Sequence, residues 1–111
     1  MKGISTPPTK NYARTKTGEY TGNNTDNRSI DVGVDLSSKN NVCIGIKAND
    51  TKEAVRRIDT SQGDLTAWYN AQTDIANAIQ SLNSTGFVLG TDERVNGDGV
   101  LYRYVVTWEE P

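Results

Sequence analysis

The sequence predicts an all-β protein: an antiparallel β-sandwich or jelly-roll-like domain of about six or seven short strands, with one short helix and an extended N-terminal arm. Three observations predict this fold. Several stretches alternate apolar and polar residues, which is typical of strands because successive side chains point to opposite faces. Clusters of Gly, Asn, Asp and Ser separate these stretches at the roughly 8–12-residue spacing of sandwiches and barrels. The apolar content of 34% and the mean hydropathy of −0.65 indicate a thin core with a solvated extension, or a core completed in an oligomer.

Residues 1–17 form the predicted arm, and residues 18–111 form the β-sandwich domain. The arm contains Pro7-Pro8, which favours an extended backbone, and four basic residues with no acidic one among its first sixteen, a charge of +4. Since the whole chain carries −2, the remaining residues carry −6. The arm is either a disordered tail or a segment that becomes ordered on a partner. In the second case we expect contacts with another subunit or a capsid from Ile4, Pro7, Pro8, Tyr12, Arg14 and Lys16.

Two alternating stretches follow the arm. After a short strand at Gly18–Thr21 and a turn cluster at 22–27, Arg28–Leu36 places Ile30, Val32, Val34 and Leu36 on one face. Asn41–Lys47 repeats the pattern with Val42, Ile44 and Ile46 pointing inward. Because only a short polar link separates the two stretches, we expect them to pair as a hairpin.

The middle of the chain is less regular. Residues 48–60 are compatible with a helical turn or a strand, and their high charge and low apolar content favour a strand or edge segment over a core helix. Leu65–Tyr69 is a short strand candidate. Over Asp74–Leu82 the period changes, because Ile75, Ala78, Ile79 and Leu82 follow the i, i+3, i+4, i+7 spacing of a helix that packs one apolar stripe on a sheet.

The C-terminal part carries the strongest strand signals. Gly86–Thr91 and Val100–Trp108 both alternate, and the second places Val100, Tyr102, Tyr104, Val106 and Trp108 on one face. Between them, Asn96-Gly97-Asp98-Gly99 offers residues that accept positive φ, as a tight reversal requires. The two stretches are therefore predicted to form a β-hairpin.

The composition argues against several kinds of chemistry. The chain has no histidine, which removes the commonest general base and metal ligand, and its single cysteine, Cys43, is interpreted as a small strand residue. The run Asn96–Gly99 is similar to part of an EF-hand loop, but Arg94 and Val105 occupy positions that need acidic ligands. Asp92, Glu93 and Asp98 lie in a polar turn unsuited to a desolvated acid pair. We predict no enzymatic activity, no cofactor and no metal.

The aromatic residues allow two interpretations. Core and subunit-interface packing is the first. The alternative is a ligand face on which sugar rings stack, made of Trp68, Tyr69, Tyr102 and Tyr104. Nucleic acid is not an expected partner, because four arm charges without interleaved aromatics offer few phosphate contacts. The first ten residues have no apolar run, so we expect no signal peptide and no membrane contact.

Three segments together resemble a small β-sandwich domain of tailed-bacteriophage virion structural proteins. They are Tyr20–Thr25 (YTGNNT), Arg28–Val34 (RSIDVGV), and Gly86–Asp92 (GFVLGTD) followed by Val95-Asn96, Gly99 and Tyr102-Arg103-Tyr104-Val105. The resemblance spans residues 18–108. The chain departs from the pattern after Val34, where a Pro and a Phe-rich run are usual, and at Asn24, where Gly is common.

The resemblance implies a capsid decoration (cement) protein that stabilises a phage head through its β-domain and arm. It further implies a homotrimer, contact with the major capsid protein of the same virus, synthesis in the host cytoplasm and a final place on the capsid surface. The alternative is a receptor- or glycan-binding tip domain of a head or tail fibre.

Overall fold

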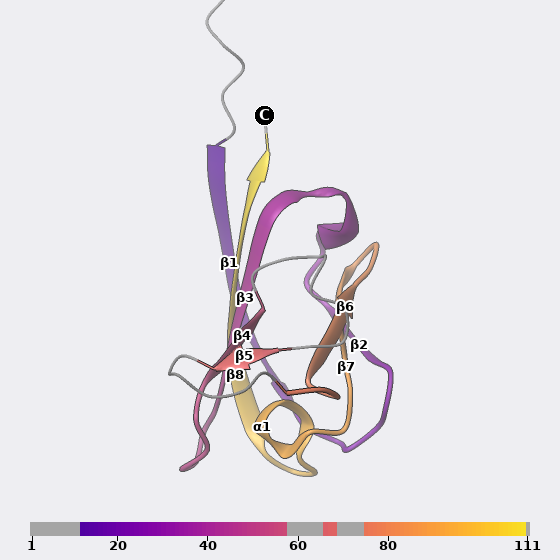
Figure 1. Ribbon diagram of the computed structural model, residues 1–111, viewed down its shortest axis with the longest axis vertical. Helices are drawn as coiled ribbons and strands as arrows, with labels where there is room; N and C mark the ends of the chain where they lie inside the picture. The colour runs from indigo at the N-terminus through magenta and orange to yellow at the C-terminus, as the bar shows by residue number, and fades with distance from the viewer. Residues whose placement is uncertain (1–11, 58–65, 69–74, 111) are drawn as a thin grey trace, which may run out of the picture.

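The computed structural model describes residues 12–57, 66–68 and 75–110, which form two antiparallel sheets packed face to face (Figure 1). The five-stranded sheet has the order β1-β8-β3-β4-β5, and the three-stranded sheet has the order β2-β7-β6. The prediction of an all-β sandwich is confirmed. The strands are β1 (Tyr12–Thr21), β2 (Arg28–Asp31), β3 (Asn40–Ala48), β4 (Val55–Arg57), β5 (Ala67–Trp68), β6 (Ile79–Leu82), β7 (Gly86–Leu89) and β8 (Leu101–Glu110), with a 3₁₀ turn η1 (Leu36–Ser38) and a short helix α1 (Glu93–Asn96).

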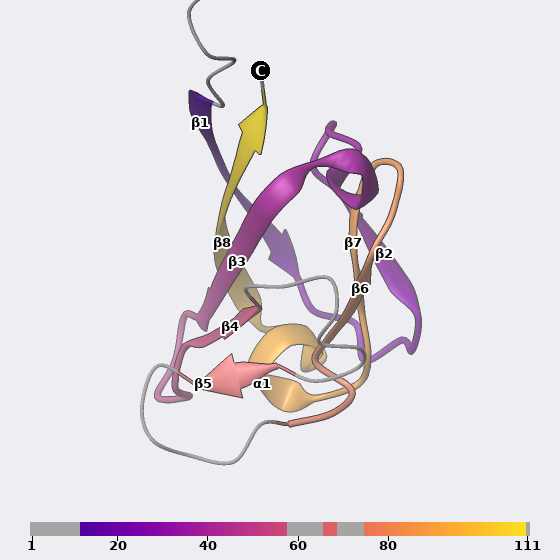
Figure 2. The same cartoon turned by 45° about the horizontal axis from the view of Figure 1, so that its top comes forward.

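Strand β8 lies inside the larger sheet, between β1 and β3. It pairs with β1 along ten residues, from Tyr12 opposite Glu110 to Thr21 opposite Leu101, and with β3 on its other side. Its predicted alternation is confirmed, since Tyr102, Tyr104, Val106 and Trp108 are buried and the residues between them are not. Both ends of the described chain therefore lie at the same end of the molecule, away from α1 (Figures 1 and 2).

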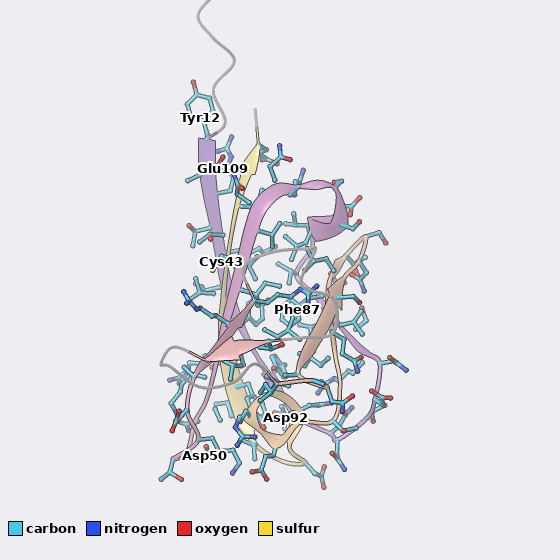
Figure 3. The ribbon with its side chains drawn as sticks, in the orientation of Figure 1. Tyr12, Cys43, Asp50, Phe87, Asp92 and Glu109 are labelled. Carbon is cyan, nitrogen blue, oxygen red and sulfur yellow. The ribbon has the colours of Figure 1, made fainter. Side chains whose placement is uncertain are left out.

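The core fills the space between the two sheets. Strand β3 contributes Val42, Ile44 and Ile46 as predicted, and Phe87 points between the sheets from β7 (Figure 3). Burying such a side chain fully contributes about 1.5–3 kcal/mol. The other buried apolar side chains include Ile30, Leu36, Val55, Ile79, Leu89 and Val95.

The two predicted hairpins are wrong. Strands β7 and β8 belong to different sheets and are joined through α1, so residues 96–99 do not form a two-strand turn. Likewise β2 pairs with β7, whereas β3 pairs with β8 and β4. Alternation shows which side chains are buried, but it does not show which strands share hydrogen bonds. A polar link between two strands can carry the chain from one sheet to the other, or it can reverse the chain within one sheet.

The strand predicted over Arg28–Leu36 is shorter than expected. Strand β2 ends at Asp31, Gly33 has a φ of +80°, and the chain turns into η1 at Leu36. The apolar side chains still reach the core, because Ile30, Val32 and Leu36 are buried. The loop after β2 thus follows the core surface without continuing the ladder.

The helix predicted over Asp74–Leu82 is also wrong across its described part. Residues Ile79–Leu82 form β6, which pairs with β7 through a register shift, and Ile75 makes an isolated bridge to Thr66. Asn77 has a φ of +61°, which a helix cannot accommodate. The apolar spacing reflects a kinked, bulged segment that buries Ala78 and Ile79 together.

The ambiguous middle segment contains strands. Strand β4 covers residues 55–57, which confirms the preference for a strand there, and β5 lies within the predicted 65–69 stretch. The rest of the predicted 58–74 features lies outside the described residues. In the part of the chain that the structure describes, no helix is long and apolar enough to cross a membrane.

Candidate functional site

The segments that carry the phage resemblance meet at one corner of the sandwich, around the buried side chain of Asn96. Its amide nitrogen donates to the carbonyl oxygens of Thr25 (2.8 Å) and Gly90 (3.0 Å). Its amide oxygen accepts from the backbone N–H of Asn23 (3.0 Å) and from the Arg28 guanidinium (3.1 Å). These four bonds use both donors and both lone pairs of the amide. We call this arrangement the Asn96 clip.

Two tyrosines extend the clip to the strands. The Tyr20 hydroxyl donates to the carbonyl of Val95 (2.6 Å), and the Tyr102 hydroxyl donates to the carbonyl of Glu93 while accepting from the N–H of Gly97. Their rings stack with centroids 5.3 Å apart. Burial raises the pKa of Tyr20 and of Tyr102 above the ordinary value of 10.0, which extends to higher pH the range in which both phenols are neutral donors.

The loop at Gly22 closes the same corner. Its N–H donates to the carbonyl of Val100 (2.8 Å), and its own carbonyl accepts from the N–H of Gly99 (2.9 Å). A Cβ at residue 22 would overlap the carbonyl oxygen of Gly97, so only glycine fits. The motif residues of this corner therefore join loop 22–27 to α1 and the start of β8.

The carboxylates near α1 have a local role. Asp92 caps the helix by accepting from the N–H of Arg94 (2.8 Å), and it pairs with the Arg94 guanidinium at 3.3 Å. Glu93 and Asp98 are exposed. Among the described residues, no group of three or more His, Cys, Asp and Glu side chains is arranged to hold a metal ion.

The aromatic residues of β8 lie in the core. Tyr102 has an exposed fraction of 0% and Tyr104 of 7%, and Tyr104 meets Phe87 edge-on with centroids 5.6 Å apart. Trp108 is also buried. These two tyrosines therefore present no face on which a sugar could stack, unlike the alternative ligand face expected from the sequence. Trp68 lies in β5, and Tyr69 lies outside the described residues.

The described part of the predicted arm is a strand. Residues 12–17 form the first part of β1, where Tyr12 has an exposed fraction of 57% at the tip (Figure 3). Arg14 pairs with Glu110 at 3.2 Å, and Lys39 pairs with the same carboxylate at 2.9 Å. The hydrogen bond from Lys39 is the main cause that lowers the pKa of Glu110. Ile4, Pro7 and Pro8 lie outside the described residues, and Lys16 is exposed.

The face of the larger sheet that points away from the three-stranded sheet forms a second candidate surface. Val105 projects there with an exposed fraction of 47%. Beside it is an open groove of about 390 Å³, lined by Gly45, Ile46, Lys47, Ala54, Arg103, Tyr104 and Val105. Cys43, on β3, is a free, half-buried thiol.

No protein-family model matches the sequence, and neither a curated protein nor a solved structure has significant similarity to the chain. The resemblance to phage structural proteins therefore rests on the motif residues alone and stays a prediction. Asn96 is the residue of this corner whose role the sequence did not reveal. In the sequence it belonged to the Val95-Asn96 pair of the resemblance and to the Asn-Gly turn signal, and neither indicates a buried amide.

Proposed function

We propose that this protein is a capsid decoration protein that stabilises a phage head through its arm and its β-domain. The observation that carries the proposal is the way β1 holds the arm. All ten residues of β1 pair with β8, an inner strand of the larger sheet, and the exposed Tyr12 stands at the end of this strand pair that lies away from α1 (Figure 3). A force on a segment that precedes this strand pair is transmitted to the core, because β1 must slide along β8 or separate from it before the segment comes free.

The charge distribution supports the same use. Residues 1–17 carry +4 and the remaining chain −6; Arg14 and Lys16 belong to β1, where Arg14 pairs with Glu110, so Lys2 and Lys10 are the charges that can bind the acidic body of a neighbouring copy or an acidic capsid surface. On a lattice, each additional contact acts at a high effective concentration, which raises avidity without a large individual interface.

The copy number of the protein in purified virions is the first measurement. Hundreds of copies in a simple ratio to the major capsid protein would support decoration. About a dozen copies would support the fibre-tip alternative, and absence from virions would contradict both.

Binding to purified heads tests the arm directly. We expect a chain that lacks residues 1–11 to bind heads at least about tenfold more weakly than the full chain. Lys2→Glu and Lys10→Glu, each made as a single variant, should weaken binding in the same direction. Lys52→Glu is the matched control, because Lys52 pairs with Asp50 on the body at 3.5 Å. Equal binding by the truncated and the full chain would overturn the proposed role of the arm.

A further inference from the structure

The exposed face of the five-stranded sheet carries an uncharged patch. On β8, Val105 and Thr107 alternate with the buried Tyr104 and Val106, so they face away from the core. The register aligns them with residues of β1 and β3 in two adjacent rows. One row is Thr15, Thr107 and Cys43, and the next is Thr17, Val105 and Gly45. We call these six residues the outer patch.

Charged residues border the outer patch: Arg56 of β4 lies beside Gly45, and one row lies beyond each end of the patch. At one end are Glu19, Arg103 and Lys47, with Arg103 pairing with Glu19 at 3.1 Å. At the other end are Ala13, Glu109 and Asn40. The first row has a net charge of +1 and the second a net charge of −1, so the two ends of the patch are electrostatically complementary.

We propose that the outer patch is the contact between two copies of this chain, packed face to face about a two-fold axis perpendicular to the strands. That rotation keeps β8 over β8 and exchanges the two ends of the patch. Glu109 of one copy then lies over Arg103 of the second copy, and Thr107 lies over Val105. The other two-fold axis in the plane, parallel to the strands, would place Glu109 over Glu109 and is disfavoured by repulsion.

The residue sizes fit this arrangement. Cys43 of one copy lies over Gly45 of the second, and the remaining patch residues are Thr and Val. Small side chains let two sheets approach to the spacing of about 10 Å found in sandwiches. Val105, the large apolar side chain exposed at the centre, would lose its contact with water.

The area predicts a weak dimer. The contact would include the two rows of the outer patch and the charged row beyond each end, on three strands. With strands about 4.8 Å apart and a two-residue repeat of about 6.8 Å, these four rows cover about 400 Å². Stable complexes bury about 800 Å² per partner, so we expect reversible association at high concentration only. The dimer does not depend on capsid binding, and the two proposals can fail separately.

Sedimentation equilibrium of the full chain over a range of concentrations tests the proposal. We expect a monomer–dimer equilibrium that Val105→Lys weakens at least about tenfold. Ser81→Lys is the matched control, since Ser81 is an exposed position of β6 in the other sheet. Thermal unfolding of both variants checks that their fold is kept.

A charge exchange tests the geometry. Glu109→Arg and Arg103→Glu should each weaken the dimer, and the double variant should restore most of the loss, because the pair is re-formed across the two-fold axis. A full chain that stays monomeric up to millimolar concentration would overturn the proposal. So would a trimeric mass, or an equal dimer constant for Val105→Lys. A chain lacking residues 1–11 that dimerises while the full chain does not would identify the arm as the occupant of the patch instead.

Discussion

Asn96 shows at the scale of one residue how a polar side chain organises a small core. Its buried amide makes four hydrogen bonds, and those bonds cross from residue 96 to residues 23, 25, 28 and 90. Each bond adds only about 0.5–1.5 kcal/mol net, but a buried partner left unsatisfied costs about 1–3 kcal/mol. Loss of the Asn96 clip should therefore cost more free energy of unfolding than the loss of one average hydrogen bond.

Asn96→Ala should lower the free energy of unfolding by about 3 kcal/mol, because it leaves the N–H of Asn23 and the carbonyls of Thr25 and Gly90 without their partner. Urea denaturation measures this change. Asn40→Ala is the control, since the Asn40 side chain is exposed on β3, and we expect it to change stability by less than about 0.5 kcal/mol. Similar losses for both variants would contradict the clip.

Alanine substitutions at two glycines of the same corner distinguish the cost of steric overlap from the cost of backbone strain. Gly22→Ala should cost more than about 2 kcal/mol, because its Cβ would overlap the backbone of Gly97. Gly99→Ala should cost about 1 kcal/mol, because residue 99 has a φ of +77° but open space around it. The urea midpoints of the two variants report the order, and the reverse order would show that the corner opens to accept a side chain.

At the scale of the elements, the pairing of β1 with β8 decides how the arm is joined to the domain. The register continues to Tyr12 opposite Glu110, and the ion pair between Arg14 and Glu110 lies within it. The basic side chains of the ribbon also limit unwanted pairing at its free edge, as charged residues do on edge strands. The boundary expected at residue 17 falls inside this strand.

Deletion of residues 1–17 should lower the free energy of unfolding by about 2 kcal/mol relative to deletion of residues 1–11. The longer deletion removes six cross-strand pairs, Tyr12 to Thr17, and a few ladder hydrogen bonds at about 1 kcal/mol each. Equal stability of the two truncated chains would show that the first part of β1 contributes nothing to the domain. Amide hydrogen exchange on β8 provides an independent measurement.

At the scale of the whole molecule, the buried tyrosines couple stability to pH. The pKa of Tyr20, Tyr102 and Tyr104 is raised above 10.0, chiefly because burial disfavours the charged phenolate. A group whose pKa is raised in the folded state stabilises the fold fully below its unfolded pKa, and this contribution is lost as the pH rises above that value. The three rings lie where both sheets and α1 meet.

The free energy of unfolding should therefore fall as the pH rises above about 10. Tyrosinate absorbance should show a group of tyrosines that ionises only when the far-ultraviolet circular dichroism signal is lost. Tyr20→Phe should reduce the pH dependence of the urea midpoint above pH 10, although it also removes the hydrogen bond to Val95. Ionisation of all five tyrosines before unfolding would contradict the buried placement.

Local pattern was enough to predict much of the core. The alternation of β3 and β8 placed Val42, Ile44, Ile46 and Tyr102 correctly, because a strand must bury one face and solvate the other. The spacing of Ile75, Ala78, Ile79 and Leu82 was misleading, because a bulged strand and a short helix can bury the same residues. The role of Asn96 could not be predicted for a different reason, because an Asn-Gly pair in the sequence fits a surface turn as well as a buried amide.

The sequence by itself determined the class of the fold, the buried faces of the long strands and the composition of the motif corner, because these follow from short-range periodicity and residue chemistry. Only the tertiary structure decided which strands pair, where the single α-helix of the described residues lies, and that β7 and β8 stand in opposite sheets. Pairing depends on contacts between residues far apart in the chain, such as Asn23 with Asn96, and no local pattern records the free energy of those contacts.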